Sequence, residues 1–481
     1  MMLHNSFSED EIDIKEHRLL VEQARKEILQ RYRHDLQGGT EPPIRAMVRI
    51  VKTLAQECAE RGFAPEAIQQ EIINRTIGDI DVRRITECEG ESGGSTDFRT
   101  LAEELGVALP GEDLNGYIAP GEGYQWLREQ MMHAERQLLA SGYDPRVYDT
   151  NSIGNPVLRG LLAEDMRQWG LEVSAANVAL GLGAADCIDK ILRGLAHLAR
   201  LRSQPPGTVL IAAPGFDIPE LQASFYGYQL HPVWTRAEDE FKMTASMLSR
   251  NLEENPDITV VYLTVTNNPT TFAYSPRELS DIQEVMRRFA NEGRRIHLLV
   301  DLAYIGTAQP DEDRARMRAL TSVPGTAAQT IYVSSWSKTH TLTGERFGWV
   351  VFGDTYFAMD MAASWMNSVA SLPGEWQLRF MAYHSLFQEH PELIEKIRGL
   401  YRLRRSRLRQ QLEKLNREHD LFEHIYLDDD ATIYNWSKLR PGVDFFSVFE
   451  KTGIAGIPGS TFGYSDEYIR FSVGIIPVPK D

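Results

Sequence analysis

The chain has 481 residues, of which 42% are hydrophobic and 25% are charged, a composition that is typical of a folded globular protein and excludes a disordered or fibrous one. Since domains commonly hold roughly 150 residues, this length allows about three domains, or one large α/β domain with smaller additions. The 51 Lys and Arg residues against 68 Asp and Glu residues give a formal net charge of −17, which disfavours an extended contact with nucleic acid.

Cysteine and histidine spacing gives no sign of a disulfide framework or a metal site. Cys58, Cys88 and Cys187 are far apart and form no CxxC pair, and the 12 histidines include no HExxH motif. The N-terminal segment is acidic and lacks the apolar stretch of a signal peptide, and no run of about 18 apolar residues follows it. We therefore expect a cytoplasmic protein with no metal and no membrane contact.

Residues from about 10 to 80 show the spacing of amphipathic helices. A third helix is expected to begin at Pro65, because proline is tolerated in a first helical turn. The segment from Gly90 to Thr96 (GESGGST) has the composition of a flexible linker, so an accessory helical region with its linker is expected over residues 1–95. The apolar stripes of the first two helices are Leu20, Ala24, Ile28 and Tyr32, then Met47, Ile50, Leu54 and Cys58.

From about residue 150 onward, apolar runs alternate with amphipathic helical segments, a pattern typical of a largely parallel sheet covered by helices. In such a sheet, ligands bind at the carboxyl ends of the strands. The polar residues Asn268, Asp301 and Lys338 all lie at or just beyond the ends of these runs. The runs are 208–214, 258–266, 296–304, 330–338 and 347–353.

The segment VALGLGAADCIDKIL joins an expected strand to a helix through small residues. The backbone N–H groups of Gly183, Ala184 and Ala185 can therefore hold a phosphate at the start of that helix. Gly181-Leu182-Gly183 also begins a GxGxxG dinucleotide fingerprint, but Asp186 replaces the third glycine and would oppose a pyrophosphate.

Two further strand ends carry polar groups that suit a ring-shaped ligand. The Asn268 amide, before Pro269, could donate to a ring oxygen, although an Asn-Pro pair most often only initiates a turn. Asp301 ends an apolar strand, where an unpaired carboxylate is costly and a protonated ring nitrogen would compensate it. Tyr304 follows three residues later and can reach an oxygen of the same ring. An N-cap aspartate and a core tyrosine are the alternative.

The segment SSWSKTHTLTGERFG carries the strongest chemical signal. Lys338 follows a buried strand and can form an imine with an aldehyde cofactor if part of it stays unprotonated. Ser335 and Arg346 are suitable phosphate ligands, one through its hydroxyl and one through its charged fork. Lysines near strand ends are common and usually solvated, so Lys338 supports a cofactor site only together with the neighbouring motifs.

Taken together in this order, the segments resemble the fold-type I pyridoxal-phosphate enzymes, specifically the aminotransferase class I/II family, over residues from about 145 to 475. The resemblance implies an α/β fold with a largely parallel seven-stranded sheet flanked by helices, a smaller α+β C-terminal domain and an N-terminal helical extension. It implies an arm over 96–155, a large cofactor-binding domain over 156–375 and a small domain over 376–481.

The same resemblance implies a role for each residue that matches the family motifs. Lys338 becomes the imine-forming lysine, Asp301 the partner of the pyridine nitrogen, and Tyr304 and Asn268 the ligands of the ring oxygen, with Asn268 also near the substrate. The phosphate is held by Ser335 and Arg346 and by the turn from Gly183 to Ala185, and Ser337 joins the cofactor-binding set.

Three more residues receive roles by resemblance. Phe216 stacks against the cofactor ring, with a core phenylalanine as the alternative. Arg470 grips the α-carboxylate of an amino-acid substrate, with a solvated edge-strand arginine as the alternative. Tyr148 reaches the phosphate of a neighbouring subunit, which implies a homodimer with active sites at the interface. The segment Tyr117 to Trp126 is a candidate contributor to substrate binding.

The sequence departs from the family pattern at three places. The phosphate turn reads GAA without a hydroxyl, Thr271 stands where the family has glycine, and the accessory region before Gly90 has no counterpart in short members. We predict an aminotransferase that acts at Cα of an amino acid. Alternatives with the same cofactor are elimination or replacement, carbon–carbon bond formation, decarboxylation and oxidation.

A pyridoxal-phosphate-binding transcription regulator with an N-terminal DNA-binding domain is a third hypothesis. Residues 10–90 contain 13 Lys and Arg against 16 Asp and Glu, a net of −3. A DNA-binding module presents a basic face, so we expect no nucleic-acid partner.

Overall fold

The computed structural model describes residues 9–38, 43–76, 78, 122–148, 152–426 and 432–474. The expected linker from Gly90 to Thr96 and the start of the segment at Tyr117 lie outside these residues. The chain forms two compact units, one with residues 1–79, 403–428 and 433–481, the other with residues 80–402 and 429–432. The four segments expected from the sequence stay a prediction of domain organisation.

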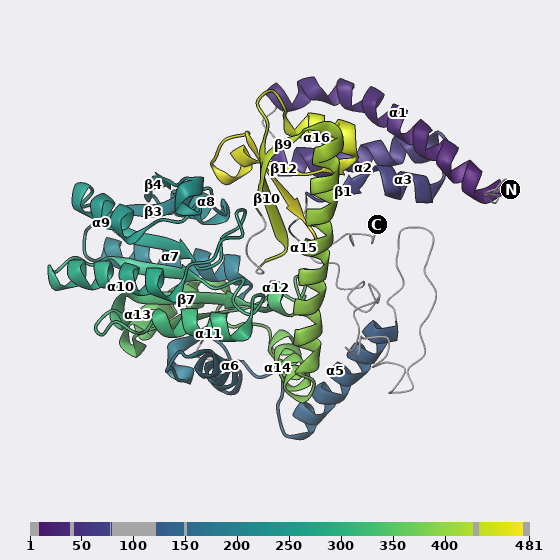
Figure 1. Ribbon diagram of the computed structural model, residues 1–481. Helices are drawn as coiled ribbons and strands as arrows, with labels where there is room; N and C mark the ends of the chain where they lie inside the picture. The colour runs from purple at the N-terminus through teal and green to yellow at the C-terminus, as the bar shows by residue number, and fades with distance from the viewer. Residues whose placement is uncertain are drawn as a thin grey trace. The chain divides into compact units, whose positions relative to one another are not determined.

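The second unit is built on a seven-stranded sheet (Figure 1). Neighbouring strands are parallel except at β8, which runs antiparallel to both β2 and β7. This arrangement confirms the expected α/β fold with a largely parallel seven-stranded sheet. In spatial order the strands are β2 (Val178–Leu182), β8 (Phe347–Phe352), β7 (Thr330–Ser335), β6 (His297–Asp301), β5 (Ile258–Thr264), β3 (Thr208–Ala213) and β4 (Gln229–Trp234).

Successive residues of a strand point to opposite faces of the sheet. Each face therefore presents apolar side chains on which helices pack. On one face, Ile188 and Ile191 of α7 and Trp365 of α13 form a buried cluster with strand residues such as Val209 and Val260. The helices of this unit are α5 (Glu122–Ala140), α6 (Pro156–Trp169), α7 (Ala184–Leu201), α8 (Ile218–Phe225), α9 (Ala245–Glu254), α10 (Pro276–Asn291), α11 (Pro310–Ala319), α12 (Trp336–Thr339), α13 (Thr355–Val369), α14 (Gly374–Glu389) and the first part of α15 (Glu392–His419).

Local sequence sets where the helices begin and end. The amide oxygen of Asn155 accepts a hydrogen bond from the Val157 N–H at the start of α6, and Gly170 ends this helix with a left-handed φ of 106°. At α10, Ser275 and Glu278 form a capping box ahead of a stripe of buried apolar residues. These signals are local, so they mark the element boundaries in the sequence itself.

The first unit contains a four-stranded antiparallel sheet and a short parallel pair. The four strands, in spatial order, are β12 (Ile457–Pro458), β13 (Tyr468–Ser472), β10 (Tyr434–Leu439) and β9 (Phe422–Tyr426), and the pair is β1 (Ile73–Asn74) with β11 (Ile454–Ala455). The helices of this unit are α1 (Glu9–Gly38), α2 (Pro43–Glu60), α3 (Pro65–Glu71), α16 (Phe445–Thr452) and the rest of α15.

The N-terminal helices therefore pack with the C-terminal segment of the chain. The buried Arg25 of α1 forms an ion pair with Glu71 at 3.2 Å and donates to the backbone oxygen of Glu450 from α16. The start of α3 at Pro65 and the stripe from Met47 to Cys58 are confirmed. The first stripe is wrong at Leu20, which is 39% exposed, because α1 buries the adjacent Val21 instead.

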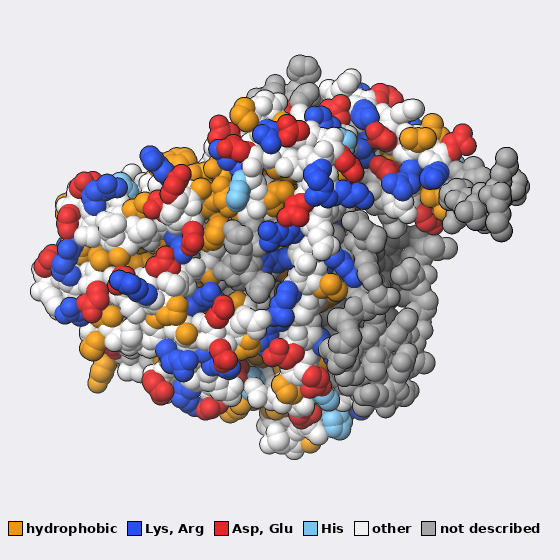
Figure 2. Space-filling model, in the orientation of Figure 1, with side chains coloured by type: hydrophobic (Ala, Val, Ile, Leu, Met, Phe, Trp, Pro, Cys, Tyr) orange, Lys and Arg blue, Asp and Glu red, His pale blue; other side chains and the backbone are white. Residues whose placement is uncertain are grey.

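Among the described residues, no helix combines the length and the apolarity that spanning a bilayer requires. Figure 2 shows acidic and basic side chains intermixed over the visible face of the described surface.

Replacing Trp365 by alanine tests the packing between α13 and the sheet. This side chain is fully buried, and its indole N–H donates to the Leu180 backbone oxygen at 2.6 Å. We expect Trp365→Ala to lower the free energy of unfolding by about 3–5 kcal/mol, measured by chemical denaturation. Val369→Ala, at a 43% exposed position of the same helix, is the control and should cost far less. Equal losses in the two variants would contradict this packing.

Candidate active site

The turn between β2 and α7 forms a possible phosphate cradle. Gly183 has a φ of +85° and precedes Ala184, the first residue of α7. The N–H groups in the first turn of a helix have no partner within the helix, and the helix dipole favours an anion there. A Cβ atom on Gly183 would collide with the guanidinium of Arg346, so the turn and this arginine lie in contact.

Strand register places the other expected phosphate ligands beside this turn. Gly348 of β8 pairs with Gly181 on one side and with Ser335 on the other. Ser335 is buried at the end of β7. Arg346 donates from Nη1 to the Thr343 backbone oxygen at 2.9 Å and from Nη2 to the Leu182 oxygen at 3.4 Å. The structure therefore brings the turn, the hydroxyl and the guanidinium to one edge of the sheet.

Lys338 lies on the four-residue helix α12, directly after β7. Its backbone oxygen accepts a hydrogen bond from the Tyr401 hydroxyl of α15 at 2.9 Å. Two residues before the lysine, Trp336 packs against Phe380 of α14 with ring centroids 4.7 Å apart and against His340 at 4.4 Å. Aromatic packing thus holds α12 against the core of the unit while Lys338 itself remains half-buried.

Asp301 is the last residue of β6 and is 4% exposed. Its Oδ2 accepts a hydrogen bond from the Tyr262 hydroxyl at 2.6 Å, and its Oδ1 accepts one from the Ala303 N–H at 2.8 Å. Burial raises the pKa of the Asp301 carboxyl, and the two donors counter part of this rise. Asp301 caps no helix, since the next helix, α11, has Gln309 at its N-cap.

Asn268 and Tyr304 lie beyond the ends of β5 and β6, and both are buried. The neighbouring Asn267 shapes the loop after β5, because its amide donates to the Pro214 oxygen at 3.0 Å and to the Thr270 hydroxyl at 3.1 Å. Thr271, at the position where the family has glycine, has a φ of +70°. The backbone there keeps the left-handed conformation that glycine adopts most easily.

The other site residues expected from the sequence lie in several different elements. Ser337 is buried on α12, and Phe216 is half-buried beyond the end of β3. Tyr148 is 62% exposed. Arg470 belongs to the first unit, where it is 3% exposed on the interior strand β13, so it is no solvated edge-strand arginine. Its guanidinium donates to the Thr76 oxygen at 2.9 Å and lies 4.3 Å from the ring centroid of Tyr434.

Parallel pairing explains why the central candidates converge. Asp301 is in register with Thr264 of β5 and with Val333 of β7, so the segments after these strands leave the sheet at a common edge. This edge carries Asn268, Asp301, Ser335, Lys338 and, through β8 and β2, Arg346 and Gly183. Sequence reasoning missed Tyr262, whose only signal is a hydroxyl within an otherwise apolar central strand.

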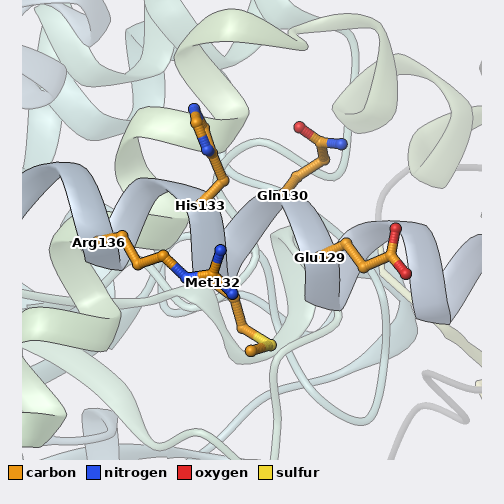
Figure 3. Close-up of a pocket in the computed structure, with 5 residues that line it drawn as sticks. All are labelled: Glu129, Gln130, Met132, His133 and Arg136. Atoms are coloured by element: carbon orange, nitrogen blue, oxygen red, sulfur yellow. The ribbon is translucent and has the colours of Figure 1, made fainter.

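Two cavities lie in the described part of this unit. One, of about 330 Å³, reaches this edge at Ser335 and is otherwise lined mainly by Trp336 and Thr339 of α12 and by residues of α6, α14 and α15, but not by Lys338 or Asp301. The other, of about 620 Å³, borders α5, where Figure 3 shows Glu129, Gln130, Met132, His133 and Arg136 projecting from one helix. Within the described residues, no group of three His, Cys, Asp or Glu side chains could hold a metal ion.

Comparison with known proteins identifies the family. The profile described as aminotransferase class I and II matches residues 119–476. An LL-diaminopimelate aminotransferase of Maridesulfovibrio salexigens is 25% identical over 287 residues, covering 59% of this chain and 69% of that protein. An aspartate aminotransferase of Pinus pinaster is 25% identical over 390 residues, covering 78% of this chain and 73% of that one.

Solved structures share the fold. A mutant aspartate aminotransferase of Thermus thermophilus superposes with a TM-score of 0.63 at 19% identity, over 91% of this chain and 95% of that chain. An archaeal alanine:glyoxylate aminotransferase gives a TM-score of 0.64 at 18% identity, over 90% and 91% of the two chains. The fold is that of the fold-type I aminotransferases, and the chain belongs to the aminotransferase class I and II family and is an enzyme.

The contact between Gly183 and Arg346 can be tested by adding one methyl group. We expect Gly183→Ala to lower the free energy of unfolding by about 1–2 kcal/mol because of its positive φ, and to displace the flexible guanidinium of Arg346 from the turn. Gly293→Ala is the matched control, because Gly293 has a φ of +84° and open space where the methyl would lie. Chemical denaturation measures both, and calorimetry with inorganic phosphate should show weaker binding only for Gly183→Ala. Equal phosphate binding in Gly183→Ala and Gly293→Ala would contradict the proposed cradle.

Proposed function

We propose that this enzyme is a pyridoxal-phosphate-dependent aminotransferase that acts at Cα of an amino acid. The observation that carries the proposal is the common sheet edge, where Lys338, the buried Asp301 and the Gly183–Arg346 cradle lie in one unit. Membership of the aminotransferase class I and II family supports the same chemistry.

The residues at this edge fit each part of the cofactor. A phosphate suits the first turn of α7 and the guanidinium of Arg346, since both offer N–H donors and positive potential. Asp301 suits a protonated ring nitrogen, because a buried carboxylate without a cation is costly. Lys338 supplies the primary amine that an aldehyde requires, and Asn268 and Tyr304 supply donors for the ring oxygen.

The mechanism assigns a separate task to each side chain. Pyridoxal phosphate, when bound, supplies an aldehyde for amine exchange and a ring that withdraws electrons from Cα. Asp301 keeps a negative charge beside the ring nitrogen and so favours its protonated form. Lys338 would act as the general base that takes the proton from Cα of the amino acid and then as the general acid that returns a proton. Ser335 and Arg346 hold the phosphate and thereby fix the orientation of the ring.

Arg470 is proposed to bind the substrate α-carboxylate. Arginine presents two parallel N–H donors to a carboxylate, and Tyr434 supports the guanidinium plane. The relatives named for LL-diaminopimelate and aspartate support an α-amino acid as the substrate class. The proposal leaves the substrate side chain unassigned.

The assembly and location are proposed together. The enzyme is a cytoplasmic homodimer, in which the exposed Tyr148 of one protomer reaches the cofactor phosphate of its partner. The exposure of this tyrosine supports the role, because a side chain that serves a neighbouring subunit must project from its own.

Replacing Lys338 tests the central assignment. We expect Lys338→Ala to lose turnover by roughly 10²–10⁴-fold or more, because the proton carrier at Cα is removed. The absorbance of the lysine-bound cofactor should also disappear, while chemical denaturation shows an unchanged fold. Lys451→Ala, at an exposed lysine of α16, serves as the control. Unchanged turnover in Lys338→Ala would exclude this lysine from catalysis.

The reaction type is tested with the wild-type enzyme and a set of amino acids. Transamination leaves pyridoxamine phosphate on the protein in the absence of an acceptor, which chromatography of the released cofactor detects. Product formation without any pyridoxamine phosphate would favour elimination, decarboxylation or oxidation instead.

Arg470→Lys tests carboxylate recognition. A lysine keeps the charge but loses the bidentate geometry, so we expect KM for the amino acid to rise about 10–100-fold with a smaller change in kcat. Activity toward a primary amine without a carboxylate should change little. An equal loss for both substrates would mean that the variant disturbs the fold and not recognition.

A further inference from the structure

Tyr262 lies next to Asp301 in the centre of the sheet. The register of β5 with β6 pairs Tyr262 with Leu299 and Thr264 with Asp301, so the tyrosine lies two residue pairs before the carboxylate and on the same face of the sheet. The two side chains are 3% and 4% exposed. The Tyr262 hydroxyl donates to Asp301 Oδ2 at 2.6 Å. This contact joins a central strand of the core to the proposed cofactor edge.

The environment of Asp301 makes this hydroxyl important. One donor, the Ala303 N–H, serves Oδ1, and the other, Tyr262, serves Oδ2. None of the ion pairs found in the described part of the chain includes Asp301. A buried carboxylate without a cation stays ionised only if hydrogen bonds offset its desolvation.

Packing alone does not require the Tyr262 hydroxyl, because a phenylalanine would pack equally well at this position. β5 reads ITVVYLT, and five of its seven residues are buried. A phenylalanine ring would fill the same space and remove one donor. Burial and the neighbouring Asp301 raise the pKa of Tyr262 well above its ordinary value, so the hydroxyl keeps its proton and remains a donor.

We propose that Tyr262 is a positioning residue that keeps Asp301 ionised and turned toward the cofactor ring nitrogen, an inference that rests on the proposed function. Other titratable residues of the site are Tyr304, in the loop after β6, and Lys338, on α12. The partner of Asp301 on β7 is Val333, which carries no charge. Tyr262 is thus the titratable side chain that the flanking strands place against the carboxylate.

The chain offers a matched control. Tyr332 lies on β7, is 3% exposed like Tyr262, and donates its hydroxyl to the Leu320 backbone oxygen at 3.3 Å. Tyr332→Phe therefore removes a buried hydroxyl and one hydrogen bond without touching Asp301. Any general cost of losing a buried tyrosine hydroxyl appears in both variants.

The first measurement is pyridoxal phosphate affinity of the apo-protein, by absorbance titration between pH 5.5 and 8.5. We expect Tyr262→Phe to weaken binding roughly 10–100-fold near pH 7, and Tyr332→Phe about twofold or less. Because the pKa of Asp301 rises further without its donor, the acid limb of binding should move to higher pH. Equal affinities in the two phenylalanine variants across this range would overturn the proposal.

A double-mutant cycle shows whether the effect passes through Asp301. Asp301→Asn removes the charge that the hydroxyl stabilises, so adding Tyr262→Phe to this variant should cause no further loss of affinity. A further loss as large as that in the wild-type background would mean that Tyr262 acts by packing alone.

The second readout uses no cofactor. The folded-state pKa of Asp301 lies above its unfolded value, so the folded apo-protein binds the proton more tightly and loses stability as pH rises through the folded pKa. Tyr262→Phe should raise the unfolding equilibrium constant about tenfold more than Tyr332→Phe at pH 8, and equally near pH 4. A pH-independent difference would contradict the role.

The two proposals fail in different ways. If wild-type protein binds no pyridoxal phosphate, the proposed function fails, whereas the pH dependence of apo-protein stability still measures the coupling of Tyr262 to Asp301. If wild-type protein binds the cofactor and Tyr262→Phe matches Tyr332→Phe in both readouts, only the positioning role fails.

Discussion

A carboxylate buried at the end of a central strand has to be stabilised by its surroundings, and the proposed site is arranged around this requirement. Asp301 is 4% exposed and accepts hydrogen bonds from Tyr262 and Ala303. Backbone pairing fixes its place as well, because the Val265 N–H donates to the backbone oxygen of Asp301 and the Leu302 N–H donates to the backbone oxygen of Val333. The backbone at Asp301 is therefore fixed between β5 and β7, while Tyr262 and Ala303 hold the carboxylate. A ring nitrogen that carries a proton would complete its electrostatic environment.

The position of Lys338 depends on packing behind it. α12 has only four residues, too few for a stable isolated helix, so tertiary contacts must hold it. Trp336 supplies them through Phe380 and His340, and burial lowers the pKa of His340 well below its ordinary value, so its ring packs as a neutral group. The lysine thus belongs to a short helix that the aromatic contacts of Trp336 hold in place.

The sequence predicts the sheet and its functional edge because both leave local signals. Buried strands appear as apolar runs, and Asp301 and Lys338 stand out as polar residues at their ends. The edge strand β4 was not predicted, because four of its six residues are exposed and it has no apolar run. Tyr262 was missed for the opposite reason: within a buried strand a tyrosine looks like core, and only pairing with β6 shows its partner. The packing of Arg25 against Glu71 and Glu450 joins residues 46 and 425 positions apart, which no local pattern reveals.

Two departures from the family pattern, the GAA turn and Thr271, have local physical compensation, and so does the charge of Asp186 in the first turn of α7. Asp186 would oppose a phosphate if its charge were free, but its carboxylate accepts from the Leu182 N–H at 2.7 Å and forms an ion pair with the fully buried Lys190. The missing hydroxyl in the GAA turn leaves the backbone donors of α7 in place, since these depend on helix geometry and not on side chains. Thr271 has a positive φ, a conformation that glycine adopts most easily. The backbone donors of the turn remain and the charge of Asp186 is paired with Lys190, so these residues do not argue against the cofactor.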